Sequence, residues 1–191
     1  MKALVCMLLL TACGDAATPD HDTIDADTAD TAEVTPGTLT FHATPSSGEA
    51  VVVRQASLSA DELVLEVATS GLQADDQVFA IGARLTYDPD VLSFIDATPG
   101  EAWDGAVTDA SAARPGTLVL AVAHPHAFFE EPGPPLGDEV LYRLRFAITR
   151  VAATPLTLVA SRSRALVWPG PSSDPQRRLS ISFVGGALTL D

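Results

Sequence analysis

Apolar and polar side chains alternate along the chain from Leu39 onward, most clearly in the segments 78–87 and 140–150. In the first, the predicted inward residues are Phe79, Ile81, Ala83, Leu85 and Tyr87, and the predicted outward residues are Val78, Ala80, Gly82, Arg84 and Thr86. In the second, Val140, Tyr142, Leu144, Phe146 and Ile148 alternate with Leu141, Arg143, Arg145, Ala147 and Thr149. Because successive side chains of a strand point to opposite faces, a period of two predicts strands with one dry and one wetter face.

Weaker runs with the same period lie before, between and after these two segments. They cover residues 39–43, 51–54, 63–69, 91–97, 117–123, 156–160, 179–183 and 187–190. Turn-forming pairs such as Asp88-Pro89, Pro99-Gly100 and Pro115-Gly116 separate them, and no run has helical spacing long enough to compete. Roughly eight to ten short strands at such intervals predict an all-β fold of two packed antiparallel sheets, a sandwich of the jelly-roll or Greek-key kind.

Residues 1–12 have the features of an export signal. Met1 and Lys2 form a minimal positive region, and the apolar run 3–10 is too short to cross a bilayer of roughly 30 Å as a helix. The sequence Leu10-Thr11-Ala12-Cys13 resembles a bacterial lipobox. The resemblance implies cleavage before Cys13 and a diacylglycerol on its sulfur; the alternative is a soluble secreted protein with a chance cysteine.

The net charge of −14 is unevenly distributed. Residues 14–36 hold seven acids and no base, whereas 37–191 hold 18 acids and ten arginines. Self-repulsion predicts an extended spacer, and the Gly and the closing Glu of an EF-hand calcium loop are missing from it. We therefore predict a signal peptide at 1–12, a lipidated Cys13 with a disordered acidic linker at 13–37, and a sandwich domain at 38–191.

Composition and motifs argue against two classes of function. Nucleic acid is a poor partner because phosphate binding needs clustered Lys and Arg, and Lys2 is the only lysine. The sequence also has none of three motifs that would indicate an enzyme: a Gly-x-Ser-x-Gly elbow, a His-Glu-x-x-His motif and a Gly-rich phosphate loop. Pairs of acids could indicate a glycosidase. However, pairs such as Glu130-Glu131 are neighbours in sequence, and nothing in the sequence raises the pKa of one carboxyl group of the pair. We assign no catalytic residue and no cofactor.

One stretch carries a family resemblance. The residues Arg84-Leu-Thr-Tyr87-Asp88-Pro89-Asp90-Val91-Leu92, followed by Pro99-Gly100-Glu101, resemble the signature of cohesin domains. A Gly-led strand at 116–123, a Leu-x-Phe-x-Ile strand at 144–148 and a Gly185-Gly186 ending follow in the same order. The resemblance covers about 50–190 and implies a nine-stranded jelly-roll sandwich related to some carbohydrate-binding modules. Tyr87 would close the inner face, Asp88-Pro89 would make the turn, and Leu92 would re-enter the core.

The resemblance also implies a binding face. Cohesins bind dockerins, small calcium-loaded modules, largely through the outward face of one sheet, and the strand before Tyr87 would belong to it. Arg84 and Thr86 are the polar candidates for partner contact there. The other outward positions, Ala80 and Gly82, lack the polar contacts of familiar cohesins. The sequence therefore leaves the partner open, dockerin-like or otherwise.

The loop 124–135 is the most unusual segment. His124, His126, Glu130 and Glu131 are residue types that ligate zinc, but no second cluster completes a tetrahedral set, and we assign no metal. Phe128 and Phe129 cannot both point inward from a strand, so they either cap the core or leave one ring exposed as a binding anchor.

Two tryptophans are candidates for carbohydrate stacking. Trp103 and Trp168, together with Phe128, would serve a carbohydrate-binding module as platforms. Core or edge packing is the simpler interpretation of both tryptophans, since platforms usually come as coplanar groups.

The sequence thus predicts a bacterial lipoprotein anchored in the cell envelope, at the outer membrane or cell surface. Its membrane contact is through lipid only, and its cohesin-like domain binds a protein partner, in extracellular assembly or polysaccharide breakdown. Two alternatives stay open: a carbohydrate-binding module of the same superfamily, which would bind polysaccharide, and a structural envelope subunit with no small ligand.

Overall fold

Extended strands make up nearly all regular structure in this computed structural model, which describes residues 37–73, 78–124, 137–167 and 178–191. The strands are β1 (Leu39–Ala43), β2 (Ala50–Leu58), β3 (Glu62–Ser70), β4 (Val78–Thr86), β5 (Leu92–Pro99), β6 (Val107–Arg114), β7 (Thr117–Ala123), β8 (Val140–Ile148), β9 (Thr154–Leu158), β10 (Arg164–Val167), β11 (Arg178–Leu179), β12 (Ser182–Val184) and β13 (Gly186–Leu190). Two short 3-10 turns, η2 (Glu101–Trp103) and η4 (Ala160–Arg162), are also present. The predicted all-β class is confirmed.

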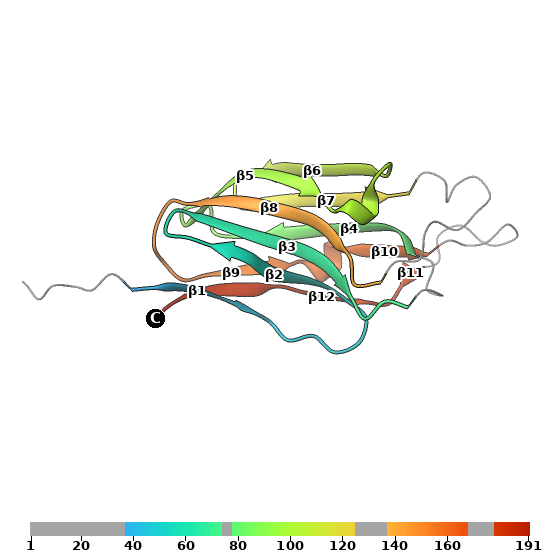
Figure 1. The fold of residues 1–191 in the computed structure, drawn as a ribbon, viewed down its shortest axis with the longest axis horizontal. Coiled ribbons are helices and arrows are strands. Elements are labelled where there is room, and N and C mark those ends of the chain that lie inside the picture. The colour runs from blue at the N-terminus through green and yellow to red at the C-terminus, as the bar shows by residue number, and fades with distance from the viewer. Residues whose placement is uncertain (1–36, 74–77, 125–136, 168–177) are drawn as a thin grey trace, which may run out of the picture. The chain divides into compact units, whose positions relative to one another are not determined.

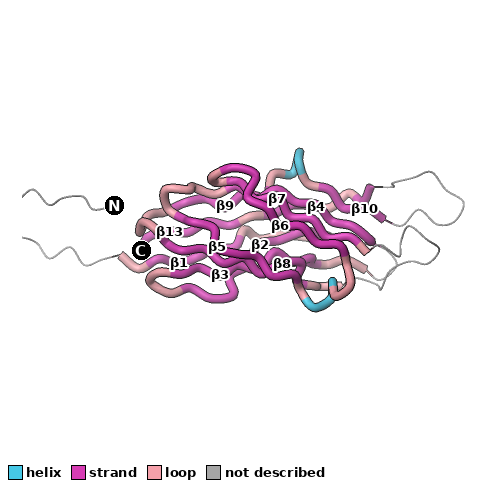
Figure 2. The backbone as a smooth tube through the Cα atoms, turned by 90° about the horizontal axis from the view of Figure 1, so that it is seen from above, coloured by secondary structure: helices cyan, strands magenta, loops and turns pink. Residues whose placement is uncertain are grey.

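The strands form two sheets that lie as two layers (Figures 1 and 2). The first, called the β3 sheet, has the order β12-β2-β3-β8-β5, with β12 parallel to β2 and the other pairs antiparallel. The second, called the β4 sheet, is centred on β4. One edge of β4 pairs with β7, which in turn pairs with β6. The other edge pairs with β10 near its start and with β9 near its end, and β13 and β1 continue beyond β9.

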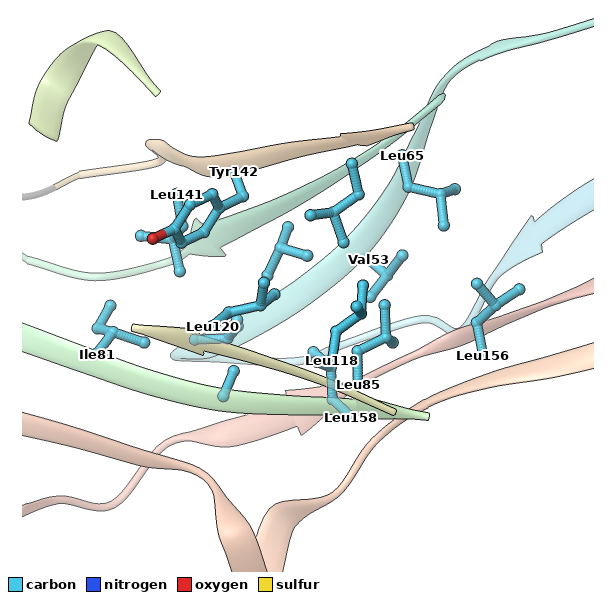
Figure 3. Packing of buried hydrophobic residues seen from close by; sticks show 14 of the residues in the cluster. Val53, Leu65, Ile81, Leu85, Leu118, Leu120, Leu141, Tyr142, Leu156 and Leu158 are labelled. Carbon is cyan, nitrogen blue, oxygen red and sulfur yellow. The ribbon is translucent and has the colours of Figure 1, made fainter. Parts of the chain in front are cut away.

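The core lies between the inner faces of the two sheets (Figure 3). Leu65 and Leu144 of the β3 sheet and Leu85, Leu118 and Leu156 of the β4 sheet are at most 1% exposed. Each such leucine contributes about 1.5–3 kcal/mol of burial free energy. From Tyr142 to Phe146 the predicted alternation is present, with Arg143 and Arg145 exposed between buried residues. Leu141, predicted to point outward, is instead 2% exposed and belongs to the core, because the register between β8 and β3 shifts by one residue there.

In β4, too, one expected orientation is wrong. Val78 belongs to the core and is 2% exposed, although the alternation places it on the outward face. The pairing with β10 explains the difference, because the register shifts by one residue opposite Leu166 and Val167. Such a bulge inserts one extra residue and reverses the direction of the side chains beyond it. From Ala80 to Thr86 the predicted alternation of burial is present.

The strand inventory also differs from the nine strands expected. Thirteen strands occur in the described residues. The pattern does not reveal β6 and β10, because β6 is largely exposed and β10 has four residues. The run 179–183 divides into the end of β11 and the start of β12, and these strands belong to different sheets. Thr154 and Pro155, expected in a turn, begin β9.

The Tyr87-Asp88-Pro89 segment forms the turn between β4 and β5. The Asp88 carboxylate accepts a hydrogen bond from the Asp90 amide at 2.9 Å, and the Asp88 carbonyl accepts one from the Leu92 amide at 3.0 Å. Leu92 is fully buried, so the chain re-enters the core there. The Tyr87 ring packs edge-on against Phe146 with the ring centroids 5.1 Å apart. This local arrangement agrees with the structural roles that the resemblance implies.

Gly116 holds this turn against the β6–β7 hairpin. Its φ of +75° is the left-handed conformation that glycine adopts readily, and its carbonyl accepts a hydrogen bond of 3.0 Å from the Tyr87 amide. A Cβ at Gly116 would lie 2.7 Å from the Tyr87 carbonyl oxygen. The close approach therefore requires glycine.

All described residues belong to one unit, Pro36–Asp191. In this part of the chain, no helix has the length and apolar composition needed to span a membrane. Cys13 and the linker precede the described residues, so lipidation and the domain boundaries stay predictions.

Candidate functional site

The strand before Tyr87, which the sequence predicts to bind a partner, is β4, so the outer face of the β4 sheet is the candidate site. We call its central part, on β10, β4, β7 and β6, the β4 face. Its outward residues are Arg164 and Leu166 on β10; Ala80, Gly82, Arg84 and Thr86 on β4; Val119, Ala121 and Ala123 on β7; and Val107, Asp109, Ser111 and Arg114 on β6. Their sequence neighbours Ala165, Ile81 and Leu120 lie in the core, which fixes the direction of the face.

The register aligns these residues in rows across the four strands. Gly82 pairs with Arg164 on one side and with Ala121 on the other, and Ala121 pairs with Asp109. The adjacent row is wholly apolar: Leu166, Ala80, Ala123 and Val107. Directly opposite residues of antiparallel strands project from the same face. The apolar row and the Gly82 row therefore form one continuous patch.

The middle of the patch is open and carries only small side chains, those of Ala80, Gly82, Ala121 and Ala123. No atom lies within 4 Å of the position that a Cβ on Gly82 would occupy. Val107 at the edge of the patch is 63% exposed. Such a surface lets another backbone or a small apolar side chain approach closely, as glycine in a strand often does.

Arg84 and Thr86, the predicted partner-facing residues, lie on this face. The Nε atom of Arg84 is buried and has no hydrogen-bond partner among the described residues. The Arg84 backbone is anchored from the side: its carbonyl accepts a hydrogen bond of 2.8 Å from the Val159 amide, and its amide donates one of 3.2 Å to Ser163 Oγ. Thr86 Oγ1 lies 3.4 Å from the Thr157 carbonyl. Their role in binding stays a prediction.

The outer face of the β3 sheet is different, because its charges are paired. Glu66 on β3 lies between Arg54 and Arg143, with O–N distances of 2.8 and 3.0 Å. Arg145 contacts Glu62 and Asp96, each at 2.8 Å. Burial opposes the ionisation of Glu66, but hydrogen bonds from both arginines outweigh it and lower the pKa of Glu66 below its ordinary value of 4.5. The described acids on this face already have partners.

Two shallow hollows lie on either side of Pro99–Glu101. One, of about 330 Å³, is bounded by this segment, Asp138–Val140 and Arg143. The other, of about 470 Å³, reaches Trp103–Ala106 and Thr108. The Asp138 carboxylate accepts a hydrogen bond of 2.7 Å from the Gly71 amide, so it already has a structural role. Within the described ranges, no three His, Cys, Asp or Glu residues gather as a metal site would require.

Trp103 does not form an exposed stacking platform. It is 1% exposed, and its ring stacks on His124 with centroids 4.7 Å apart and planes 14° apart. The turn η2 folds it into the core, which corrects its candidacy as a carbohydrate contact and agrees with the alternative of core packing. The other two candidates, Phe128 and Trp168, lie outside the described residues.

Sequence reasoning missed about half of the β4 face. Residues of β6 and β10, among them Asp109, Arg114 and Arg164, were not expected there because neither strand was predicted. The signal that was available is the Arg114-Pro115-Gly116 turn, which predicts a hairpin partner for the strand that follows it.

Comparison with known proteins identifies the architecture. Neither a protein-family model nor a curated protein matches this sequence. Among solved structures, a cohesin of scaffoldin B from Acetivibrio cellulolyticus, crystallised in complex with a dockerin, has a TM-score of 0.62 at 15% identity, covering 76% of this chain and 100% of that one. A cohesin from Clostridium acetobutylicum has a TM-score of 0.55 at 16% identity, covering 81% and 91%.

A third cohesin, described as non-cellulosomal, comes from the archaeon Archaeoglobus fulgidus. Its TM-score is 0.50 at 18% identity, and the match covers 78% of this chain and 88% of that one. At these identities the similarity concerns the fold. The described unit of this chain is a β-sandwich with the cohesin fold, as the sequence resemblance predicts.

Proposed function

We propose that this chain is a non-catalytic binding module that docks a protein partner on the β4 face. The observation that carries the proposal is the open patch around Gly82, which is backed by the packed core. A sheet supported along both edges of β4 keeps its shape, so a partner meets a preorganised surface. Protein partners use such surfaces when they bury apolar area that a free monomer would leave exposed.

The narrower form of the proposal is a dockerin-type partner in extracellular assembly or polysaccharide breakdown. Its support is the fold shared with the Acetivibrio cohesin, which was crystallised with a dockerin. The Archaeoglobus relative carries the description non-cellulosomal, so the same fold also serves outside cellulosomes. A calcium chelator separates the narrower proposal from the broader one. It should release a dockerin-type partner, which is calcium-loaded, and should leave a partner of another kind bound.

A bulky side chain at Gly82 tests the docking surface. The full chain and its Gly82→Trp variant are used to capture proteins from the native cells by in vivo crosslinking. Tryptophan at Gly82 would stand in the middle of the patch, and we expect it to abolish the crosslinked partner while leaving the melting temperature nearly unchanged. Ser93→Trp is the matched control, since Ser93 is exposed on β5 and projects from the β3 sheet.

Two outcomes would contradict the proposal. One is a partner captured equally by the parent chain and Gly82→Trp but lost with Ser93→Trp. The other is a glycan array on which the chain binds sugars and Gly82→Trp binds them equally well. The second outcome would support a carbohydrate-binding module that uses residues away from the β4 face.

We also propose that the module is held at the cell envelope of a bacterium by lipid on Cys13. The lipobox-like Leu10-Thr11-Ala12-Cys13 supports this, together with the acidic stretch that follows it. Metabolic labelling with a palmitate analogue should mark the parent chain and not Cys13→Ala. Equal labelling of both chains would refute the anchor without affecting the docking proposal.

A further inference from the structure

Six arginines of the described residues lie on the outer faces of the two sheets, and they fall into two groups. Arg54, Arg143 and Arg145 lie on the outer face of the β3 sheet, and each has an acidic partner within 3.0 Å. Arg84, Arg114 and Arg164 lie on the β4 face, and none of them forms an ion pair with a described acid. Of the residues named on the β4 face, three are arginines and one, Asp109, is an acid, so this face is basic on an acidic domain.

Within the described residues, the side chains of this second group contact neutral groups and no acid. Arg164 donates to the Ser163 carbonyl at 2.6 Å, and Arg114 Nε lies 3.3 Å from Thr117 Oγ1. Arg84 Nε is buried and makes no hydrogen bond within the described ranges. An unsatisfied buried donor destabilises a protein, so a site that keeps one usually has a use for it. Arg84 as a whole is only half-buried, so a carboxylate placed over it can pair with the accessible part of its guanidinium group.

The positions of the three arginines relative to the patch are fixed by the register. Arg164 is paired with Gly82, Arg84 is two residues further along β4, and Arg114 pairs with Thr117, which itself pairs with Thr86. With strands about 4.8 Å apart and residues about 3.4 Å apart, the arginines form a diagonal across the face. The apolar row of Leu166, Ala80, Ala123 and Val107 lies along one side of that diagonal.

We infer that the partner segment is acidic: it lays small apolar side chains on the patch and carboxylates along the arginine diagonal. This inference rests on the proposed function and names the chemistry of the partner. An amphipathic helix can present an apolar stripe with Asp or Glu beside it. Carboxylates pair with guanidinium groups by short charge-assisted hydrogen bonds. The described part of the β4 face offers no aromatic ring for sugar stacking, so the pattern favours a protein segment over an acidic polysaccharide.

A displayed peptide library provides a defined probe. The full chain, purified in mild detergent, is used to select binders from a phage library of helical peptides with randomised surface positions. We expect the enriched peptides to carry net negative charge next to Ala, Val or Leu. A synthetic copy of the most enriched peptide should bind Arg84→Glu at least tenfold more weakly than it binds the parent chain. Its affinity for the parent chain should also fall as the salt concentration is raised.

Two matched variants isolate the effect of charge on the face. Arg84→Lys keeps a cation without the guanidinium fork and should bind the peptide with intermediate affinity. Arg150→Glu makes the same change in net charge away from the β4 face, where Arg150 lies 3.8 Å from Asp88. It should leave peptide affinity within about twofold of the parent chain, because an exposed and distant charge is screened. Thermal unfolding of each variant checks that it remains folded.

The outcomes separate this inference from the proposed function. If the selected peptides are acidic and their binding is lost in Gly82→Trp and in Arg84→Glu, the proposed function and this inference are both supported. If the selected peptides are neutral or basic, and Gly82→Trp abolishes their binding whereas Arg84→Glu does not change it, the inference is overturned and the proposed docking face is retained. Peptides that bind Gly82→Trp as well as the parent chain overturn the proposed docking face, and the inference with it.

Discussion

Gly100 and Gly82 show how differently two glycines can be constrained in extended backbone. A Cβ built on Gly100 would overlap the Val140 carbonyl oxygen, whereas one on Gly82 would meet open space. Gly100→Ala should therefore force the start of β8 away from η2 and lower the free energy of unfolding by about 1–3 kcal/mol. Gly82→Ala should change it by less than about 1 kcal/mol, and in the stabilising direction. Thermal unfolding followed by circular dichroism measures both.

The pair of variants is its own control, because each replaces glycine by the same side chain. Equal melting temperatures for the two would contradict the packing described here. The comparison also validates Gly82→Trp as a probe of binding, since it reports whether a side chain at that position disturbs the sheet.

Tyr142 links the two sheets through its hydroxyl. The oxygen lies 2.7 Å from the Ala121 carbonyl and 2.9 Å from the Asp109 carbonyl, so it can donate its one proton to the β6–β7 hairpin. Tyr142→Phe should lower the free energy of unfolding at pH 7 by about 1–2 kcal/mol. Urea unfolding of the variant and the parent chain provides the measurement, and an unchanged urea midpoint would mean that the hydroxyl contributes nothing.

The pH dependence of Tyr142 has a definite sign. Burial raises the pKa of Tyr142 above its ordinary value of 10.0. A raised pKa in the folded state means that the stabilisation is complete below the unfolded value and is lost as pH rises through the folded one. The Tyr142→Phe variant should therefore lose less stability than the parent chain between pH 9 and pH 11, in the same urea experiment.

At the scale of elements, β3 is stabilised by the arginines on its neighbours β2 and β8. Glu66 is the central acid, with a side chain 13% exposed, and its pKa is lowered below 4.5. Glu66→Gln should lower the free energy of unfolding at pH 7 by about 1 kcal/mol. Because the folded pKa is lowered, this contribution is present above pH 4.5 and disappears as pH falls through the folded value.

The same prediction requires the parent chain and Glu66→Gln to converge in stability at acidic pH. Urea midpoints at pH 7 and pH 3 would show this. Glu62→Gln serves as the control, since Glu62 is 36% exposed and pairs with the exposed Arg145, so its effect should be smaller. A constant difference between the parent chain and Glu66→Gln across this range would contradict the assigned ion pairs.

Elements also show where sequence patterns succeed. The strands 39–43 and 117–123 were predicted with the bounds that the structure has, because their large apolar residues face the core. In contrast, β6 reads Val-Thr-Asp-Ala-Ser-Ala-Ala-Arg and has no large apolar residue after Val107. It is an edge strand held by pairing with β7 and by the Tyr142 hydroxyl. Its stability comes from partners distant in sequence, which no local pattern contains.

At the scale of the whole domain, the first and last strands are neighbours. The Thr38 amide donates to the Asp191 carbonyl at 3.1 Å, the Asp191 amide returns a bond of 3.0 Å, and β1 pairs with β13 along its length. A circular permutant that joins Asp191 to Gly37 through a short Gly/Ser linker, opened between Ser46 and Ser47, should fold. Its β13 and β1 would form a hairpin.

We expect this permutant to melt within about 5 °C of the unpermuted 37–191 chain, because only an exposed loop is cut. Opening the same permuted chain between Gly82 and Ala83 is the control, and it should abolish cooperative unfolding because β4 lies at the centre of its sheet. Calorimetry distinguishes the two. If the loop permutant also failed to unfold cooperatively, the β1–β13 closure would be in question.

The sequence by itself determined the two-layer β class, the inward set of the central strands and the turn at Asp88-Pro89. These follow from side chains two residues apart and from turn chemistry, which act locally. It also placed Arg84 and Thr86 on the outward face of their strand. For Cys13 and the linker, the sequence remains the only basis for the prediction.

Only the tertiary structure decided which strands pair, and with them the composition of the β4 face. Strand register joins Arg164, Gly82 and Ala121 in one row although they are far apart in the chain. It also assigns Glu62, Glu66 and Asp96 to the arginines of the opposite face, and among the residues that the structure describes it gives Arg84, Arg114 and Arg164 no acidic partner. The physical reason is that pairing is set by burial of whole faces, and one residue of slip would turn every side chain to the other face.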